Sequence, residues 1–136
     1  MSAPSFSCAR NSSKMDLESM KKALGETFQE KLFELIDARG MTDPEVYKGA
    51  NVSRKLFSKI RGNRYYQPRK STVLAFAVSM RLDMEETADL LSRAGFAFSP
   101  SSLEDLVVAS FIRNSHYDIN ELNLYLFDAG LPQLGS

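Results

Sequence analysis

The chain has 136 residues, 43% of them hydrophobic, with 17 basic and 17 acidic side chains and no formal net charge. This length supports one well-packed core and is too short for a second independent domain. No apolar run approaches the roughly 18 residues of a membrane span, the N-terminus lacks the apolar core of a secretory signal, and a single cysteine excludes an internal disulfide. We therefore expect one cytoplasmic domain with extensions.

Charge is segregated along this neutral sequence. Nine basic side chains and no acidic one lie between Lys48 and Leu82. Residues 1–47 carry six basic and eight acidic groups, and residues 83–136 carry two and nine, so the three segments have charges of about −2, +9 and −7. The basic block indicates a polyanionic partner, of which the DNA backbone is the simplest. The alternative is that the segments neutralise each other across the fold.

The N-terminal part of the chain predicts a disordered arm followed by a helix. Residues 1–14 are polar and rich in serine, without a hydrophobic period. A helix is predicted over about Met15 to Arg39, weakened or bent near Gly25 and ended by Gly40. Its apolar residues recur at helical spacing: Phe28, Leu32, Leu35 and Ile36.

Two short helices are predicted next, each with its own start signal. Thr42-Asp43-Pro44-Glu45 is a capping box with a proline that the first turn tolerates, and this helix should end near Gly49-Ala50-Asn51. Ser53 is a suitable N-cap for a second helix through about Arg61. Two short capped helices with about three residues between them have the dimensions of a helix-turn-helix.

Four further helices are predicted near residues 71–81, 84–94, 102–114 and 119–129, and no alternating run indicates a strand. The predicted fold is therefore all-α, a compact helical bundle containing a helix-turn-helix, with two C-terminal helices. We divide it into a disordered arm (1–14), a helix-turn-helix domain (15–95) and a C-terminal extension (96–136) that packs on this domain and is available for oligomerisation.

The stretch Thr42 to Met80, and above all Asn51-Val-Ser-Arg-Lys-Leu-Phe-Ser-Lys-Ile-Arg-Gly-Asn-Arg64, resembles the Cro/phage-repressor (XRE-like) helix-turn-helix family. The resemblance covers about Phe28 to Leu91. It implies that the helix after the turn reads the major groove through Ser53, Arg54, Lys55 and Ser58. It implies phosphate contacts at Arg61, Asn63 and Arg64, to which we add the cations Lys59, Arg69 and Lys70. The implied core residues are Val46, Val52, Phe57 and Ile60.

Four residues depart from the family pattern. Tyr47 stands where a small residue is common at the contact between the two helices, and Asn51 stands where the turn favours glycine. Asp43 replaces a glutamine often used near phosphate, and Leu56 puts an apolar group on the predicted DNA face. A thymine methyl group could receive Leu56, and so could a protein partner.

The rest of the chain resembles a second module. Leu90-Leu-Ser-Arg-Ala-Gly-Phe-Ala-Phe-Ser-Pro-Ser-Ser102 and Tyr117-Asp-Ile-Asn-Glu-Leu122 are similar to a helical module of bacterial proteins, found alone or attached to the C-terminus of other domains. The resemblance implies a small regulator or a detached piece of a larger protein.

Signals for catalysis, metal binding or cofactor binding are weak. Ser115, His116 and Asp118 are too close in sequence to form a catalytic relay, and Cys8 lies far from His116, so no zinc site is indicated. We predict no enzymatic activity, no catalytic residue, no metal and no cofactor. Tyr65 and Tyr66, placed among cations, could stack on bases or fill the gap before the next helix.

Two functions remain after these exclusions. The first is sequence-specific binding of double-stranded DNA by a transcriptional regulator that acts as a homodimer, plausibly through residues 102–129. The second is a helix-turn-helix-like protein-interaction module whose basic face docks an acidic protein partner. Neither hypothesis requires a membrane.

Overall fold

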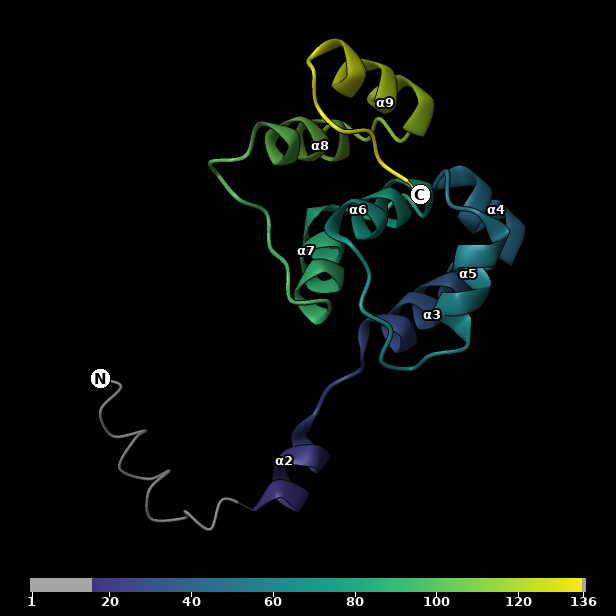
Figure 1. The fold of residues 1–136 in the computed structure, drawn as a ribbon, viewed down its shortest axis with the longest axis vertical. Coiled ribbons are helices and arrows are strands. Elements are labelled where there is room, and N and C mark those ends of the chain that lie inside the picture. Colours follow the sequence, from purple (N-terminus) through teal and green to yellow (C-terminus); the bar gives the residue numbers. More distant parts are fainter. Residues whose placement is uncertain (1–15, 136) are drawn as a thin grey trace.

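The computed structural model describes residues 16–135, and every helix or strand assigned in this range is an α-helix. Figure 1 shows the helices. They are α2 (Leu17–Ala23), α3 (Phe28–Ala38), α4 (Asp43–Gly49), α5 (Arg54–Arg61), α6 (Lys70–Ser79), α7 (Met84–Arg93), α8 (Leu103–Arg113) and α9 (Ile119–Asp128). The all-α prediction is confirmed for these residues. The arm predicted at residues 1–14 lies outside them.

The single first helix predicted over about Met15 to Arg39 is wrong, because two helices, α2 and α3, lie in this range with residues 24–27 between them. Thr27 has an extended backbone, and its hydroxyl accepts the Glu30 amide at 3.2 Å. The Glu30 carboxylate in turn accepts the Thr27 amide at 2.9 Å. This reciprocal capping box satisfies free amides of α3 and fixes a new helix start.

The two short helices α4 and α5 begin and end as predicted. The Thr42 hydroxyl accepts the Glu45 amide at 3.3 Å, and the Glu45 carboxylate accepts the Thr42 amide at 2.8 Å. Asn51 has a φ of 57° in the turn, a left-handed conformation that asparagine tolerates better than most residues. The Ser53 hydroxyl then caps α5 by accepting the Leu56 amide at 3.1 Å.

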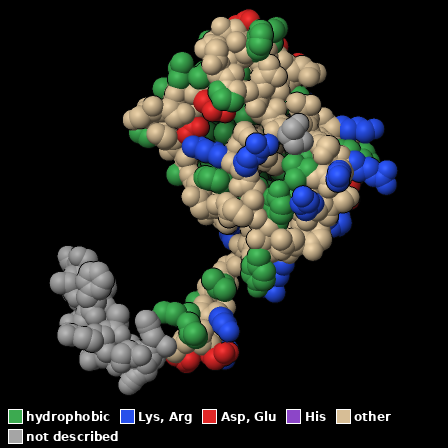
Figure 2. Space-filling view, viewed as in Figure 1, with side chains coloured by type: hydrophobic (Ala, Val, Ile, Leu, Met, Phe, Trp, Pro, Cys, Tyr) green, Lys and Arg blue, Asp and Glu red, His purple; other side chains and the backbone are tan. Residues whose placement is uncertain are grey.

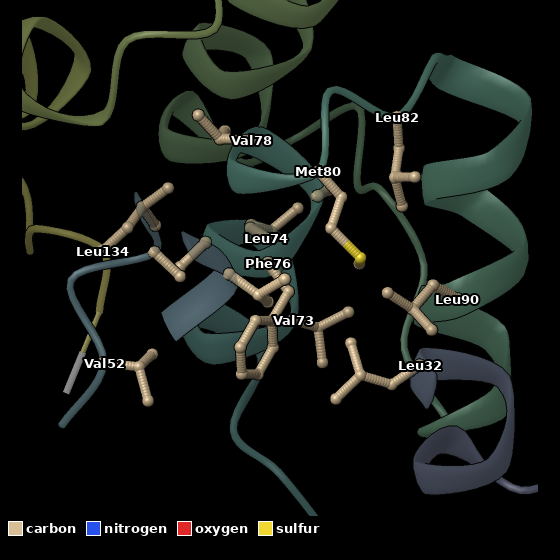
Figure 3. Packing of buried hydrophobic residues seen from close by; sticks show 14 of the residues in the cluster. Leu32, Val52, Val73, Leu74, Phe76, Val78, Met80, Leu82, Leu90 and Leu134 are labelled. Carbon is tan, nitrogen blue, oxygen red and sulfur yellow. The ribbon is translucent and has the colours of Figure 1, made fainter. Parts of the chain in front are cut away.

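Helix α6 lies at the centre of the structure. Residues 72–78 are all buried, and α6 contacts α4, α7 and α9. Figure 3 shows Phe76 and Leu74 of α6 among side chains from other elements, including Leu32 and Leu90. Each fully buried side chain of this size stabilises the fold by roughly 1.5–3 kcal/mol relative to an exposed one.

One hydrophobic core joins the helix-turn-helix to the C-terminal helices. The predicted core residues Val46, Val52, Phe57 and Ile60 are all buried. Val108 of α8 and Leu122 and Leu126 of α9 belong to the same cluster. The helices predicted from residue 70 onward begin within one residue of their expected starts, as their bounds show.

The C-terminal segment, residues 131–135, runs back to the turn between α4 and α5 (Figure 1). Leu134 is buried in the core, and its carbonyl accepts the Asn51 side-chain amide at 3.3 Å. Asn123 of α9 holds the same residue from the other side, accepting the Leu134 amide at 2.7 Å and donating to its carbonyl at 3.1 Å. A Cβ atom at Gly135 would lie 2.5 Å from the Asn51 carbonyl oxygen, so only glycine fits this close approach.

Candidate nucleic-acid interface

Helix α5 has one buried face and one charged face. Phe57 and Ile60 are buried, and Leu56 is half-buried and packs against the core. The opposite face is exposed and carries Arg54, Lys55, Ser58 and Lys59. The structure therefore brings together three of the four predicted base-reading side chains and one predicted phosphate contact on a single surface. We call these four residues the α5 basic face.

Figure 2 shows that lysine and arginine side chains gather on the side of the molecule where α4 and α5 lie in Figure 1. Within residues 16–135, Arg54, Lys55 and Lys59 form no ion pair, and the same holds for the exposed Arg69 just before α6. Cations without acidic neighbours keep their full charge available for an anionic partner.

Ser53, the fourth predicted base-reading residue, already serves as the N-cap of α5. Its hydroxyl oxygen accepts the Leu56 amide at 3.1 Å. Its position at the N-terminus of α5 places it at the end of the helix that enters the groove in helix-turn-helix proteins.

Arg61 is held by residues of two other helices. Its Nη2 atom lies 2.6 Å from the Asp43 carboxylate of α4, and its guanidinium carbon lies 4.2 Å from the centre of the Phe33 ring. The Arg61 carbonyl also accepts the side-chain amide of Gln29 at 3.0 Å. This predicted phosphate contact therefore also joins α5 to α3 and α4, and it neutralises the Asp43 charge that would repel phosphate.

Arg64 and Asn63 lie in the loop after α5. Arg64 Nε is 2.7 Å from the Glu30 carboxylate, and its guanidinium carbon is 5.4 Å from the Tyr65 ring centre. The Asn63 side-chain oxygen accepts the Tyr65 amide at 3.0 Å and so shapes the loop. Tyr65 is 68% exposed, whereas Tyr66 packs against the core. Only Tyr65 is therefore positioned to stack on a ligand.

The predicted phosphate contact at Lys70 fits the structure poorly. Lys70 Nζ lies 2.5 Å from the Asp105 carboxylate of α8, whose side chain is only 4% exposed. The same carboxylate accepts the Ser99 amide at 2.7 Å. A lysine that neutralises a buried carboxylate cannot leave it without a large penalty, so Lys70 belongs to the packing of α8 on α6.

Tyr47 fits into the fold despite its size. It is half-buried, and its ring centre lies 5.3 Å from that of Phe57 across the contact between α4 and α5. A small residue of α4 is needed at its contact with α6 instead, because a Cβ atom at Gly49 would lie 2.7 Å from Ser79 Oγ. The departure at Tyr47 is accommodated by an aromatic pair.

Lys48 was not among the predicted site residues. It is exposed in the last turn of α4 and forms no ion pair with the acidic groups of residues 16–135. Its place in the acid-free block was the only available signal. The first helix of a DNA-binding helix-turn-helix crosses the DNA backbone. If α4 takes that place, Lys48 is a further candidate for a phosphate contact.

Of the two residues considered for a metal site, Cys8 lies outside the described residues and His116 has local partners. His116 Nε2 lies 2.9 Å from the Glu121 carboxylate, and the His116 ring stacks on Phe111 with 4.9 Å between centres. Among residues 16–135 no group of three or more histidine, cysteine or acidic side chains could hold a metal ion. No helix in the same range is both long and apolar enough to span a bilayer.

Comparisons with protein-family models, with curated proteins and with solved structures found no match to this chain.

Proposed function

We propose that the protein binds double-stranded DNA in a sequence-dependent way through the α5 basic face and acts as a transcriptional regulator. The observation that carries the proposal is a group of exposed cations that form no ion pair in the described residues: Arg54, Lys55 and Lys59 on the second helix of a helix-turn-helix, and Arg69 at the N-cap of α6. Phosphate contacts supply most of the affinity of such proteins, and exposed unpaired cations make these contacts at low cost.

Each side chain of the face has a proposed role. Arg54 and Lys55 lie in the first turn of α5 and would donate to guanine O6 and N7, while Ser58 contacts a neighbouring base edge. Lys59 and Arg69, further from the helix start, would contact phosphates. Arg61 and Arg64 are paired with Asp43 and Glu30, so a phosphate would compete with these carboxylates and we expect smaller contributions from the two arginines.

The structure also bears on the competing hypothesis of an acidic protein partner. That hypothesis is favoured by three residues that depart from the pattern of DNA-binding helix-turn-helix proteins: Asp43, Tyr47 and Leu56. Asp43 is paired with Arg61, Tyr47 packs on Phe57, and Leu56 packs against the core. These three residues already have partners within the chain. The exposed part of α5 is polar and cationic, a surface better suited to a phosphate backbone than to an apolar protein contact.

The test is fluorescence anisotropy of a labelled random duplex, titrated with protein between about 50 and 200 mM salt. Binding should weaken steeply, and the plot of log K against log salt should flatten by about one unit when Lys59→Ala or Arg69→Ala removes a phosphate contact. Arg113→Ala, an exposed cation in the last turn of α8, is the control and should leave the slope unchanged.

Selection of a preferred site from a random duplex library should then give a sequence whose affinity depends on Arg54. Absence of duplex binding at the lowest salt, together with capture of an acidic protein that Lys59→Ala abolishes, would replace the DNA proposal by the interaction-module hypothesis.

A further inference from the structure

Residues 131–135, which we call the strap, are held in the way that an extended peptide is held in a groove. They follow α9 without forming a helix or strand, and of these residues only Leu134 is buried, at 1% exposure. The Leu131 amide still donates to a carbonyl of α9. Beyond it, the hydrogen bonds of the strap within the described residues go to the side chains of Asn51 and Asn123. The strap is therefore anchored by one apolar side chain and two asparagines.

Asn123 binds the backbone of the strap rather than a side chain. Its side-chain oxygen accepts the Leu134 amide at 2.7 Å, and its side-chain nitrogen donates to the Leu134 carbonyl at 3.1 Å. Asn51 donates to the same carbonyl at 3.3 Å. An asparagine amide contains both a donor and an acceptor, so it satisfies both backbone groups of one residue. In peptide recognition, bonds of this kind supply affinity for an extended chain, and side-chain pockets supply specificity.

The groove selects its peptide at two positions. Leu134 enters the hydrophobic core together with Val52, the residue after Asn51. Figure 3 shows both side chains on the same side of the buried cluster. Gly135 follows with a φ of 114°, and a Cβ atom there would lie 2.5 Å from the Asn51 carbonyl oxygen. The pattern that fits is therefore a leucine followed directly by a glycine.

Open space beside the strap allows another peptide to approach. A hollow of about 390 Å³ is lined by Gln133 of the strap, Asn51 of the turn, and Asn120, Asn123, Leu124 and Phe127 of α9. Leu124 and Phe127 are 60% and 65% exposed. Amide groups next to exposed apolar side chains suit an extended peptide, so an incoming chain can make its first contacts here while the strap is still bound.

The strap also supports the turn that precedes α5. Asn51 has the left-handed φ of 57°, and its side chain is tied to Leu134. The amide of Val52 closes the turn by donating to the Tyr47 carbonyl at 2.9 Å. Ser53 then caps α5. Loss of the strap removes the partner of the Asn51 side chain and should loosen this turn, because a left-handed residue other than glycine depends on its surroundings.

We propose that the groove between α9 and the α4–α5 turn is a binding site for extended peptides in which leucine is followed by glycine, and that the strap is its resident, exchangeable occupant. A short tether gives the strap an effective concentration of roughly millimolar, so a free peptide binds well only when the strap is weakened. Peptide binding does not rest on the proposed DNA binding, although the groove borders the turn that positions the α5 basic face.

The first experiment titrates full-length Leu134→Ala with a synthetic peptide of residues 129–136, followed by NMR. The substitution removes the anchor of the strap but leaves Asn51 and Asn123 in place, so the peptide should bind this variant at least about tenfold more tightly than wild type. Adding Asn123→Ala to Leu134→Ala should weaken peptide binding by about tenfold or more. Leu103→Ala, at a 58% exposed position on α8, is the matched control and should behave like wild type.

The second experiment varies the peptide. Gly135→Ala in the peptide should prevent binding, because the added Cβ atom collides with the Asn51 carbonyl oxygen. Leu134→Ser in the peptide should also prevent it, because the core would receive a hydroxyl in place of an apolar anchor. Gln133→Ala in the peptide is the control, since Gln133 is exposed, and it should bind as the native peptide does.

The third experiment measures hydrogen exchange at the turn. The Val52 amide should exchange faster in Leu134→Ala than in wild type, and added peptide should restore its protection. The Phe96 amide, which donates to the Leu91 carbonyl at 2.9 Å after α7, is the control and should not change. Far-ultraviolet circular dichroism checks the fold, and full-length Gly135→Ala replaces Leu134→Ala if that variant loses helix content.

Three results would overturn the inference. Folded Leu134→Ala that binds no peptide up to about 1 mM has no exchangeable site. A Gly135→Ala peptide that binds as well as the native one shows that the groove does not select the pattern. Unchanged Val52 exchange in Leu134→Ala means that the strap does not support the turn. No DNA is present in these experiments, so failure of the DNA proposal would leave their outcome unaffected.

Discussion

Lys70 and Asp105 form the most deeply buried ion pair in the described part of the chain, linking the start of α6 to α8 across 35 residues of sequence. Arg69, the residue before Lys70, is exposed and has no ion pair in residues 16–135. Two adjacent cations of the same basic block therefore have different surroundings, and substitutions separate their roles.

Lys70→Ala should destabilise the fold by about 3 kcal/mol, because it leaves the buried Asp105 carboxylate without its counter-charge. Arg69→Ala should leave the free energy of unfolding nearly unchanged and weaken DNA binding instead. Urea denaturation measures the free energy of unfolding, and the salt dependence of binding reports the lost phosphate contact. Equal stability of the two variants would mean that the Lys70 pair contributes nothing to the packing of α8.

Arg54→Ala should cost about 1–3 kcal/mol of binding free energy on the preferred duplex and little on a random one, because a bidentate contact to guanine is lost. Lys59→Ala should weaken both duplexes alike. Anisotropy titrations with the two duplexes give the ratio of the specific to the non-specific affinity for each variant. If Arg54→Ala lowers both affinities equally, Arg54 contacts phosphate and the assignment of the base-reading side of α5 is wrong.

Tyr47→Ala should destabilise the fold by about 2–3 kcal/mol, somewhat less than a fully buried ring, because it removes the partner of Phe57 at the α4–α5 contact. Tyr47→Phe keeps the ring and should remain close to wild-type stability. Thermal denaturation followed by circular dichroism distinguishes them. A stable Tyr47→Ala protein would show that the aromatic pair is not part of the helix-turn-helix contact.

The raised pKa of Glu104 makes the free energy of unfolding depend on pH. Burial raises the pKa of the Glu104 carboxyl, the neighbouring Asp105 adds to the rise, and Lys70 opposes it. The pKa of Glu104 is higher in the folded state than in the unfolded state, so burial of this carboxyl costs least in acid, where it is protonated. As pH rises through the raised pKa, ionisation of Glu104 destabilises the folded state. Glu104→Gln should therefore gain stability over wild type at pH 7 and show no such gain near pH 3, as urea midpoints would report.

Helix starts were predictable from sequence because their determinants are local. Thr42 with Glu45 and Asp83 with Glu86 form the reciprocal bonds that their spacing indicates. The same signal, Thr27 with Glu30, lies inside the range predicted as one helix, and it marks the start of α3.

The candidate interface was only partly predictable, because pairing between distant segments decides which cations stay available. The basic block contains nine cations, but three of them are paired with acids. Arg61 is paired with Asp43, Arg64 with Glu30, and Lys70 with Asp105. All three acidic partners lie outside the block, so nothing in the sequence of the block indicates that they pair with its cations. Sequence therefore located the basic surface, and tertiary structure reduces it to the cations that are unpaired in the described residues.

The return of residues 131–135 to the turn before α5 has a practical consequence for the experiments above. A peptide attached shortly after Gly135 starts close to Asn51, two residues before the cap of α5. An affinity tag there would crowd the surface whose DNA binding is to be measured, and a polyhistidine tag would add imidazoles beside the cations. Tags for binding studies therefore belong at the N-terminus.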